Sequence, residues 1–446
     1  MAQVLADEYD LVGIGFGPAN IGLAVALEEM GWSGSALFLE RQTAPDWQAE
    51  MILDGTDVQH NPLRDFVTPR NPRSYYTFLN FLKENGRLFE YLNLDNSYAL
   101  RKDYAQYIRW TARHFDRWTA YGRNLVSARL EEIVDAEENH IPRVVLKTSC
   151  GNTILAKAVS LAPGRSALVP NVFRQYLGDR VEHFTRYTTA LSRWKAEGNL
   201  RSVAVVGASQ SAIEIVLDLH SRMPDLIIHN IQRNFGYKLK DTSPFTEEIY
   251  FPDFIETFYN ASPERQKHLT TDLWRSNYGA ADADVIHQLY NRIYEQRIDG
   301  RERIQLHLNR SVLDVSSHSA NVELLMEERD GNALQRLTVD AVVLATGFKN
   351  FGAEVDQEPW HPLLDDIAPH AKKRADGSLF ITRDYRLQAA NSDRELPAIF
   401  VNGLCESSHG FGDAGSFSLL ALRSEMIAAS AKNAVKVATR DALVAA

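Results

Sequence analysis

The sequence predicts an α/β fold with two Rossmann-like domains, the second inserted into the first, and a smaller region beside them. Three observations predict it. A strand, a glycine-rich loop and a helix follow one another at the N-terminus, and the same succession recurs from Ser202. After this second unit, the apolar stretch 341–345 enters the turn Thr346-Gly347-Phe348, which indicates a return to the first domain. A chain of 446 residues is long enough for two or three such domains.

The predicted domain limits follow from this order. The first domain begins with residues 1–195 and is completed by residues 338–446, and residues 196–337 form the inserted domain. The expected strands are 9–13, 35–40, 144–148, 154–161, 226–232, 341–345 and 398–402, and the expected helices are 21–30, 75–85, 103–117 and one from 417. Segment 61–74 is rich in Pro, Asn and Arg, but apolar residues interleave with them, so an ordered loop is expected there.

Composition excludes several classes of protein. A net charge of −10 without a basic stripe argues against binding of nucleic acid. The N-terminus is acidic, and no run approaches the roughly 18 apolar residues of a membrane span, so a cytoplasmic protein is expected. Cys150 and Cys405 lack CxxC spacing, which leaves no basis for a disulfide scaffold or a metal site. Both are expected to be packing thiols.

The N-terminal loop has the pattern of a dinucleotide site. Gly13 and Gly15 occupy the first two glycine positions, and Gly17 and Pro18 lead into the helix, with Pro18 where a third glycine is usual. Gly13 is expected to permit the tight turn, and Gly15 to let the backbone approach a pyrophosphate at the helix N-terminus. Glu40, at the end of the next strand, is placed to accept hydrogen bonds from a ribose.

The second loop differs from the first in a way that indicates another nucleotide. It keeps Gly207 but has Ser209 at the second glycine position, and Gln210 and Ser211 add donors at the helix start. The following strand is succeeded by Arg233 rather than by an acid, which suits the 2′-phosphate of NADP. The alternative is that Arg233 only ends a surface strand. Two unequal dinucleotide sites indicate hydride transfer from NADPH to a flavin.

Long segments resemble the N-hydroxylating flavin monooxygenases, chiefly the ornithine and lysine N-monooxygenases of siderophore biosynthesis. They include GIGFGPANIGLAVALEE, LRDFVTPRNPRSYYTFLNFLKENGRL, SQSAIEIVLDL, SPFTEEIYFPDF, SNYGAADADVI and SHGFG, and together they cover nearly the whole chain. The resemblance implies an FAD domain split by an NADPH domain, a substrate cleft between them, and a homo-oligomer, either a dimer or a tetramer. It also implies that a C4a-hydroperoxide, formed from O2 on reduced FAD, oxygenates an unprotonated primary amine, with L-ornithine favoured.

The resemblance also implies roles for single residues. Gln59 falls on the family's glutamine beside the flavin, and Asn277 on the asparagine that contacts the substrate and the nicotinamide ribose; both are candidate catalytic residues. Ser418 falls on the serine of the closing loop near the substrate amine. Further cofactor contacts are implied for Trp47, Thr346 and Gly347.

Four features depart from the ornithine pattern. Arg64 replaces a Lys that pairs with the amino-acid carboxylate, Glu247 replaces an Asn that helps to hold it, Gln48 replaces a His, and loop 412–415 is one residue longer. Arg can hold a carboxylate bidentately, but Glu repels one unless it pairs with Arg64 or binds a substrate ammonium. Diamines such as putrescine and cadaverine, and other amino acids, therefore stay open as substrates.

Other classes of function stay open as well. A sulfur-oxidising or Baeyer–Villiger flavin monooxygenase would share both nucleotide sites but not the Asn-Tyr segment at Asn277. The alternative of a catalytically silent flavin-fold protein stays open, because Ser209 narrows the approach to phosphate. His409, in a Gly-rich loop, is a further candidate functional residue.

Overall fold

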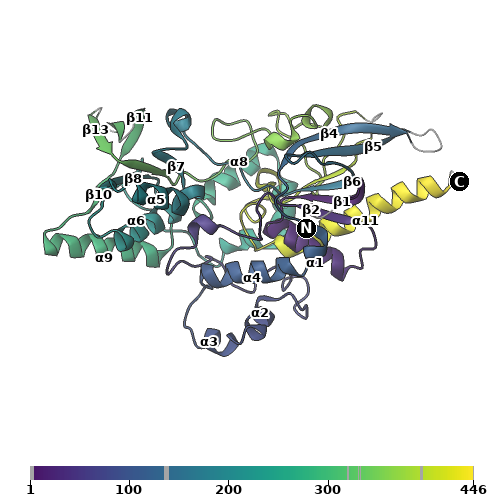
Figure 1. Cartoon of the computed structure of the whole chain (residues 1–446), viewed down its shortest axis with the longest axis horizontal. Coiled ribbons are helices and arrows are strands. Elements are labelled where there is room, and N and C mark those ends of the chain that lie inside the picture. The colour runs from purple at the N-terminus through teal and green to yellow at the C-terminus, as the bar shows by residue number, and fades with distance from the viewer. Residues whose placement is uncertain are drawn as a thin grey trace.

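The computed structural model describes residues 5–134, 140–318, 321–329, 331, 333–391 and 395–444. They form two lobes, each built on its own sheet (Figure 1). Among these residues, no helix is both long and apolar enough to cross a membrane.

The first lobe is built on a seven-stranded sheet. Its order is β3-β2-β1-β6-β5-β4, and β15 pairs with the end of β6 that extends beyond β5. The pairs of β1 with β2 and β6 are parallel, whereas β4, β5 and β6 pair antiparallel. The strands are Glu8–Ile14 (β1), Ala36–Leu39 (β2), Thr119–Ala120 (β3), Leu125–Val134 (β4), His140–Thr148 (β5), Thr153–Leu161 (β6) and Ala398–Val401 (β15).

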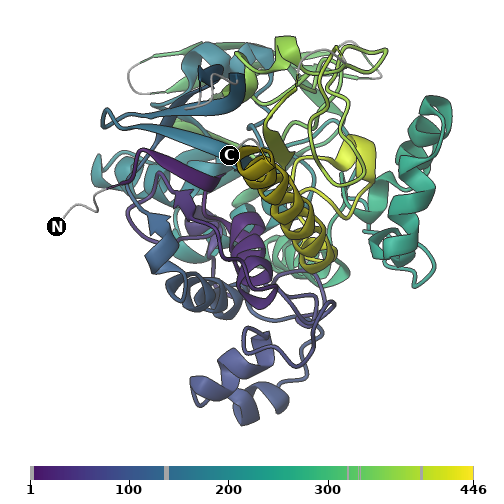
Figure 2. The ribbon, with the colours of Figure 1, turned by 90° about the vertical axis from the view of Figure 1, so that its right-hand side faces the viewer.

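Two helices from opposite ends of the chain pack together beside this sheet. Helix α1 (Pro18–Glu29) lies against α11 (Leu420–Val444), as Figure 2 shows. Gly22 allows this close approach, because a Cβ there would lie 2.4 Å from Leu420 Cδ2. The C-terminal segment thus completes the lobe that the N-terminal strand begins.

The second lobe is built on five parallel strands in the order β10-β9-β8-β14-β7. Helices α6 and α9 lie on one side of it and an antiparallel sheet, β11-β12-β13, on the other (Figure 1). The strands are Val181–His183 (β7), Ser202–Val206 (β8), Ile227–Ile231 (β9), Ile304–His307 (β10), Arg310–Ser317 (β11), Val322–Glu328 (β12), Leu334–Val339 (β13) and Ala341–Leu344 (β14). The remaining helices are Phe78–Glu84 (α2), Leu88–Leu92 (α3), Arg101–Arg113 (α4), Tyr187–Ala196 (α5), Gln210–Arg222 (α6), Pro252–Tyr259 (α7), Pro263–Asp272 (α8), Ala283–Asp299 (α9) and Glu406–His409 (α10).

Strand pairing moves the domain limits away from those predicted. Strand β14 pairs with β8 and β7, so it belongs to the second sheet and not to the returning first domain. If the inserted unit is defined by the strands of the second sheet, it runs from β7 to β14, or residues 181–344. It therefore begins before and ends after the predicted range 196–337. An apolar stretch reads alike in either sheet, so the sequence alone did not distinguish them.

The predicted loop 61–74 contains no helix or strand, and a buried carboxylate orders it. Asp65 is fully buried and accepts backbone N–H bonds from Val67, Thr68 and Phe78. These bonds join the loop to α2, which begins three residues later than the predicted helix, after the cap residue Thr77.

Candidate functional site

The first glycine loop joins β1 to α1. Gly15 takes φ +80°, and a Cβ there would lie 2.4 Å from the carbonyl oxygen of Ala162. Gly13 lies within β1, where a Cβ would lie 2.1 Å from the Phe38 ring. At Gly17 a Cβ would meet nothing within 4 Å. The turn, predicted at Gly13, therefore lies at Gly15, where φ is positive, whereas the approach of a pyrophosphate to the backbone of Gly15 stays a prediction.

The start of α1 suits an anionic ligand. The helix begins at Pro18, and no side chain caps it, so its first N–H groups and its dipole favour a phosphate. Glu40 is buried and accepts N–H bonds from Phe16 at 2.7 Å and Gln42 at 2.9 Å. Each oxygen of the Glu40 carboxylate can accept a second hydrogen bond, which leaves room for a ribose hydroxyl. The ribose contact itself stays a prediction. These residues fit the pyrophosphate and ribose of FAD.

The second glycine loop joins β8 to α6. Gly207 takes φ +150°, and a Cβ there would lie 2.4 Å from Ala345 O. Ser209 precedes α6 without capping it through its side chain, and Ser211 follows in the first turn. Arg233, just beyond β9, is exposed and has no hydrogen bond or ion pair with any residue that the structure describes. This arrangement fits a second dinucleotide that carries an additional phosphate.

The turn after β14 lies beside the second loop. Gly347 takes φ +82° and would meet nothing at Cβ within 4 Å, so it keeps an open face. The hydroxyl of Thr346 instead donates to Leu168 O. Its predicted cofactor contact therefore stays a prediction for the backbone of this turn.

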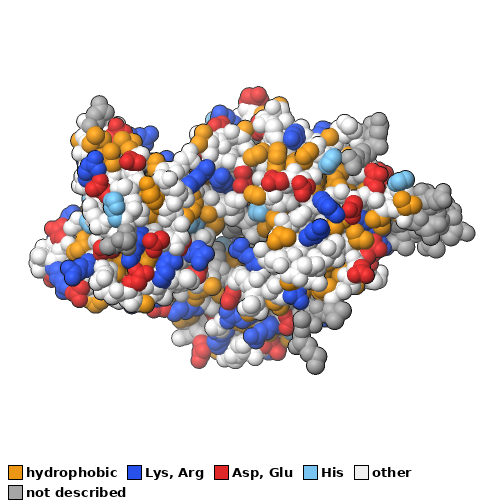
Figure 3. All heavy atoms as spheres, turned by 45° about the horizontal axis from the view of Figure 1, so that its top comes forward, with side chains coloured by type: hydrophobic (Ala, Val, Ile, Leu, Met, Phe, Trp, Pro, Cys, Tyr) orange, Lys and Arg blue, Asp and Glu red, His pale blue; other side chains and the backbone are white. Residues whose placement is uncertain are grey.

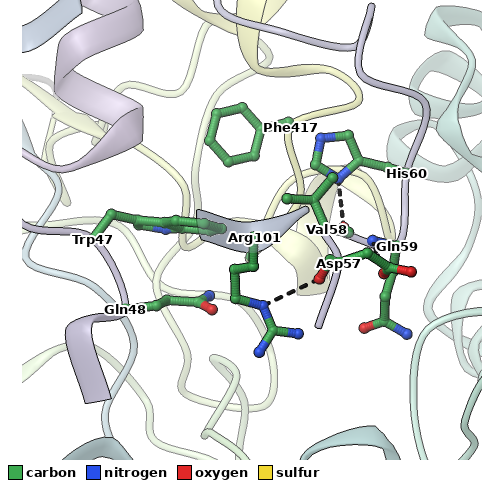
Figure 4. A pocket seen from close by; sticks show the side chains of 9 residues that line it. Trp47, Gln48, Asp57, Val58, Gln59, His60, Arg101 and Phe417 are labelled. Carbon is green, nitrogen blue, oxygen red and sulfur yellow. Dashed lines mark hydrogen bonds between the residues drawn. The ribbon is translucent and has the colours of Figure 1, made fainter. Parts of the chain in front are cut away.

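A cavity of about 110 Å³ lies between aromatic side chains of the first lobe (Figure 4). His60 stacks on Phe417 at 5.4 Å between ring centroids, and Trp47 meets Phe417 edge-on at 5.9 Å. Burial lowers the pKa of His60 to about 4, so its ring is neutral at pH 7. The ring's Nδ1–H donates to Val58 O. Gln48 and Gln59 line the same cavity. The backbone of Gln59 has a positive φ of +55°.

The predicted substrate residues come together from four separate segments. Arg64 Nη1 lies 3.3 Å from Glu247 Oε2 and 3.3 Å from Ser418 Oγ. The Arg64 guanidinium lies over the Tyr250 ring, 5.5 Å from its centroid, and the Tyr250 hydroxyl donates to Asn277 Oδ1 at 3.3 Å. The side chains of Arg64 and Glu247 are about a quarter exposed, at 26% and 25%. Seen from its upper side, the molecule is hollowed between its lobes (Figure 3).

Comparison with known proteins identifies the family. The L-lysine 6-monooxygenase/L-ornithine 5-monooxygenase family matches residues 7–350. The chain belongs to this family. The L-ornithine N(5)-monooxygenase of Burkholderia cepacia is 36% identical over 90% of both chains. An ornithine N-hydroxylase of Kutzneria, solved with reduced FAD, NADP+ and L-ornithine, is 28% identical with a TM-score of 0.87 over 96% of this chain and 99% of that one. L-lysine 6-monooxygenase of Pseudomonas syringae is 32% identical with a TM-score of 0.82 over 96% of this chain and all of that one.

The predicted fold class is thereby confirmed, and the chain is an NADPH-dependent flavin N-monooxygenase. Both glycine loops fit the two dinucleotides, FAD and NADP, that such enzymes use.

The monooxygenase also contains a buried polar network that the sequence did not predict. The Tyr278 hydroxyl accepts from Arg165 Nη1 at 2.8 Å and donates to Glu406 Oε2 at 2.7 Å. Asn350 Nδ2 donates to Glu406 Oε1 at 2.8 Å. Burial raises the pKa of Glu406 to about 7, although Arg165 opposes that shift. The network lies directly beside Asn277 in the chain and fixes the backbone that carries it.

Two other residues that the sequence analysis singled out, His409 and Cys405, are buried. His409 is buried, stacks on Tyr385 at 4.1 Å, and bonds to Ser408 and to the backbone of Arg383. It is therefore a packing residue of the core. Cys405 is buried as predicted.

The prediction for the other cysteine is wrong. Cys150 is exposed, because it lies in the turn between β5 and β6. Within the described residues, no group of three or more His, Cys, Asp or Glu could hold a metal ion.

Proposed function

We propose that this monooxygenase uses FAD, NADPH and O2 to hydroxylate the side-chain amine of an α-amino acid, with L-ornithine as the preferred substrate. The free edge of Arg64 carries the proposal. Nη1 is engaged with Glu247 and Ser418, but Nε and Nη2 bond to no residue within the described part of the chain. A guanidinium edge with two free N–H donors matches a carboxylate.

Glu247 complements this edge with the opposite charge. Its carboxylate lies beside the Arg64 guanidinium, where it can accept a hydrogen bond from the α-ammonium of a substrate whose carboxylate Arg64 holds. The pair thereby matches both charges of an α-amino acid. Ser418 and Asn277 add neutral polar groups along the same path.

The residues around the cavity are proposed to prepare the amine. When both are bound, NADPH would supply the two reducing equivalents, and FAD would carry them to O2. Gln59 and Asn277 hold the reacting groups in place, and the aromatic wall of Trp47, His60 and Phe417 excludes water. Against this aromatic side an ammonium is disfavoured relative to the unprotonated amine that can attack an electrophilic oxygen, whereas the other side of the cavity is polar, with Asp57, Gln59 and Arg101.

Glu247 favours a second candidate, oxygenation of a diamine whose distal ammonium it would bind. Rates of hydroxylamine formation across L-ornithine, L-lysine, putrescine and cadaverine test the choice. The proposal predicts the highest kcat/KM for L-ornithine, and a preference for putrescine or cadaverine would replace it by the second candidate. A homo-oligomer is proposed from the family resemblance, and sedimentation of the purified protein tests it.

A further inference from the structure

A chain of hydrogen bonds joins the cavity of the first lobe to the start of α6 in the second. Gln59 Nε2 donates to Asp282 Oδ2 at 2.7 Å. The backbone N–H of Asp282 donates to Gln210 Oε1 at 3.0 Å, and Gln210 Nε2 donates to Glu214 Oε1 at 3.0 Å. Gln210 is the first residue of α6, so the chain reaches the helix end at which the second dinucleotide is expected.

The bonds return to Gln59 along a second path and close a ring. Glu214 forms a bidentate ion pair with Arg101, with both N···O distances at 2.8 Å, and the two side chains are 2% and 7% exposed. Arg101 Nε donates to Asp57 O at 3.1 Å, and the N–H of Gln59 donates to Asp57 Oδ1 at 2.9 Å. Figure 4 shows Arg101, Asp57 and Gln59 along one side of the cavity. Because a buried ion pair has few alternative partners, the ring has a defined geometry.

Asp282 is the member of this ring that bonds directly to Gln59 and to Gln210. Gln59 has φ +55°, a conformation that costs a non-glycine residue energy and persists where neighbours hold it. The bond to Asp282 is short and charge-assisted, so it supplies such a hold. Asp282 also precedes α9, and its side chain makes no cap hydrogen bond with that helix. Its carboxylate therefore hydrogen-bonds to Gln59 and does not cap the helix.

We propose that Asp282 is a positioning residue that couples dinucleotide binding at α6 to the placement of Gln59. A phosphate at the start of α6 acts on Gln210, Gln210 on the backbone of Asp282, and the Asp282 carboxylate on Gln59. The inference rests on the proposed function in one respect, namely that NADP binds at the second glycine loop.

A binding cycle on the FAD-loaded enzyme tests the coupling without turnover. NADP+ is titrated calorimetrically into the wild type, Gln59→Ala, Asp282→Ala and the double variant. We expect Gln59→Ala to weaken NADP+ binding roughly tenfold in the wild-type background and less than about twofold once Asp282 is replaced. Flavin absorbance and thermal unfolding confirm that each variant is loaded and folded.

Asp284 provides the matched control, because it is an exposed acid in the first turn of the same helix. In a cycle with Asp284→Ala, the effect of Gln59→Ala should stay at its wild-type size. Asp282→Asn keeps an acceptor oxygen and should show a coupling between those of the wild type and Asp282→Ala. Equal effects of Gln59→Ala in all backgrounds would overturn the coupling. Absence of NADP+ binding to the wild type would instead overturn the proposed nucleotide site.

Discussion

Replacing Arg64 with Ala removes the group that is proposed to hold the substrate carboxylate. Arg64 Nη1 lies 3.3 Å from both Glu247 Oε2 and Ser418 Oγ, longer than the roughly 2.7–2.9 Å of a strong charge-assisted bond. These weak contacts leave most of the guanidinium's bonding capacity for a ligand. A hydrogen bond to a charged group contributes about 1.5–3 kcal/mol. For Arg64→Ala acting on L-ornithine, we therefore expect a loss of about 2 kcal/mol of transition-state stabilisation, which lowers kcat/KM roughly thirtyfold.

Putrescine is the matched substrate, because it has the same reacting amine without the carboxylate. Its kcat/KM should change by less than about threefold in Arg64→Ala, since no bidentate pair is lost. Arg64→Lys keeps the charge without the planar fork and should fall between the wild type and Arg64→Ala. Rates are measured as hydroxylamine formed, so that NADPH oxidation uncoupled from oxygen transfer is not counted. Equal losses on both substrates would refute the reasoning and leave Arg64 and Glu247 as a structural ion pair.

Three further predictions concern other parts of the molecule. Arg233→Ala should lower the ratio of kcat/KM for NADPH to kcat/KM for NADH at least tenfold, which corresponds to about 1.5–3 kcal/mol. An unchanged ratio would count against a contact between Arg233 and the 2′-phosphate. Burial raises the pKa of Glu406 from 4.5 to about 7, so its contribution to stability is complete below about pH 4.5 and is lost as pH rises through about 7, by about 3 kcal/mol. Glu406→Gln should flatten that dependence in urea unfolding between about pH 5 and pH 8, whereas a variant as pH-dependent as the wild type would contradict it. Gly17→Val should fold but purify with little flavin absorbance, whereas Gly15→Val should lower the Tm, because of these two glycines only Gly15 combines positive φ with a backbone clash. Full FAD in Gly17→Val would disprove the assignment of the FAD site to this loop.

The sequence predicted the units whose signals are local. A strand, a glycine loop and a helix are contiguous, so both nucleotide units were found, and the motif segments placed Arg64, Glu247, Asn277 and Ser418 in one site. The turn of the first loop lies at Gly15 and not at Gly13, because the pattern shows that a turn exists but not which residue takes positive φ.

Features that depend on distant pairing were missed for a physical reason. Strand β14 joins the second sheet through pairing with β7 and β8, and no local pattern encodes that choice. Asp282 meets Gln59 across 223 positions of sequence, and Glu406 meets Tyr278 across 128. Acids are common on protein surfaces, so only the fold distinguishes these two from solvated ones.

N-hydroxylation is tested most directly by the mass of the product that the purified enzyme forms from L-ornithine with NADPH under isotopically labelled O2. We expect one added oxygen atom, carrying the label and located on the side-chain nitrogen, with FAD bound to the enzyme. Oxidation of NADPH that yields only hydrogen peroxide across the amine panel, or oxygen on sulfur or carbon of another substrate class, would contradict it.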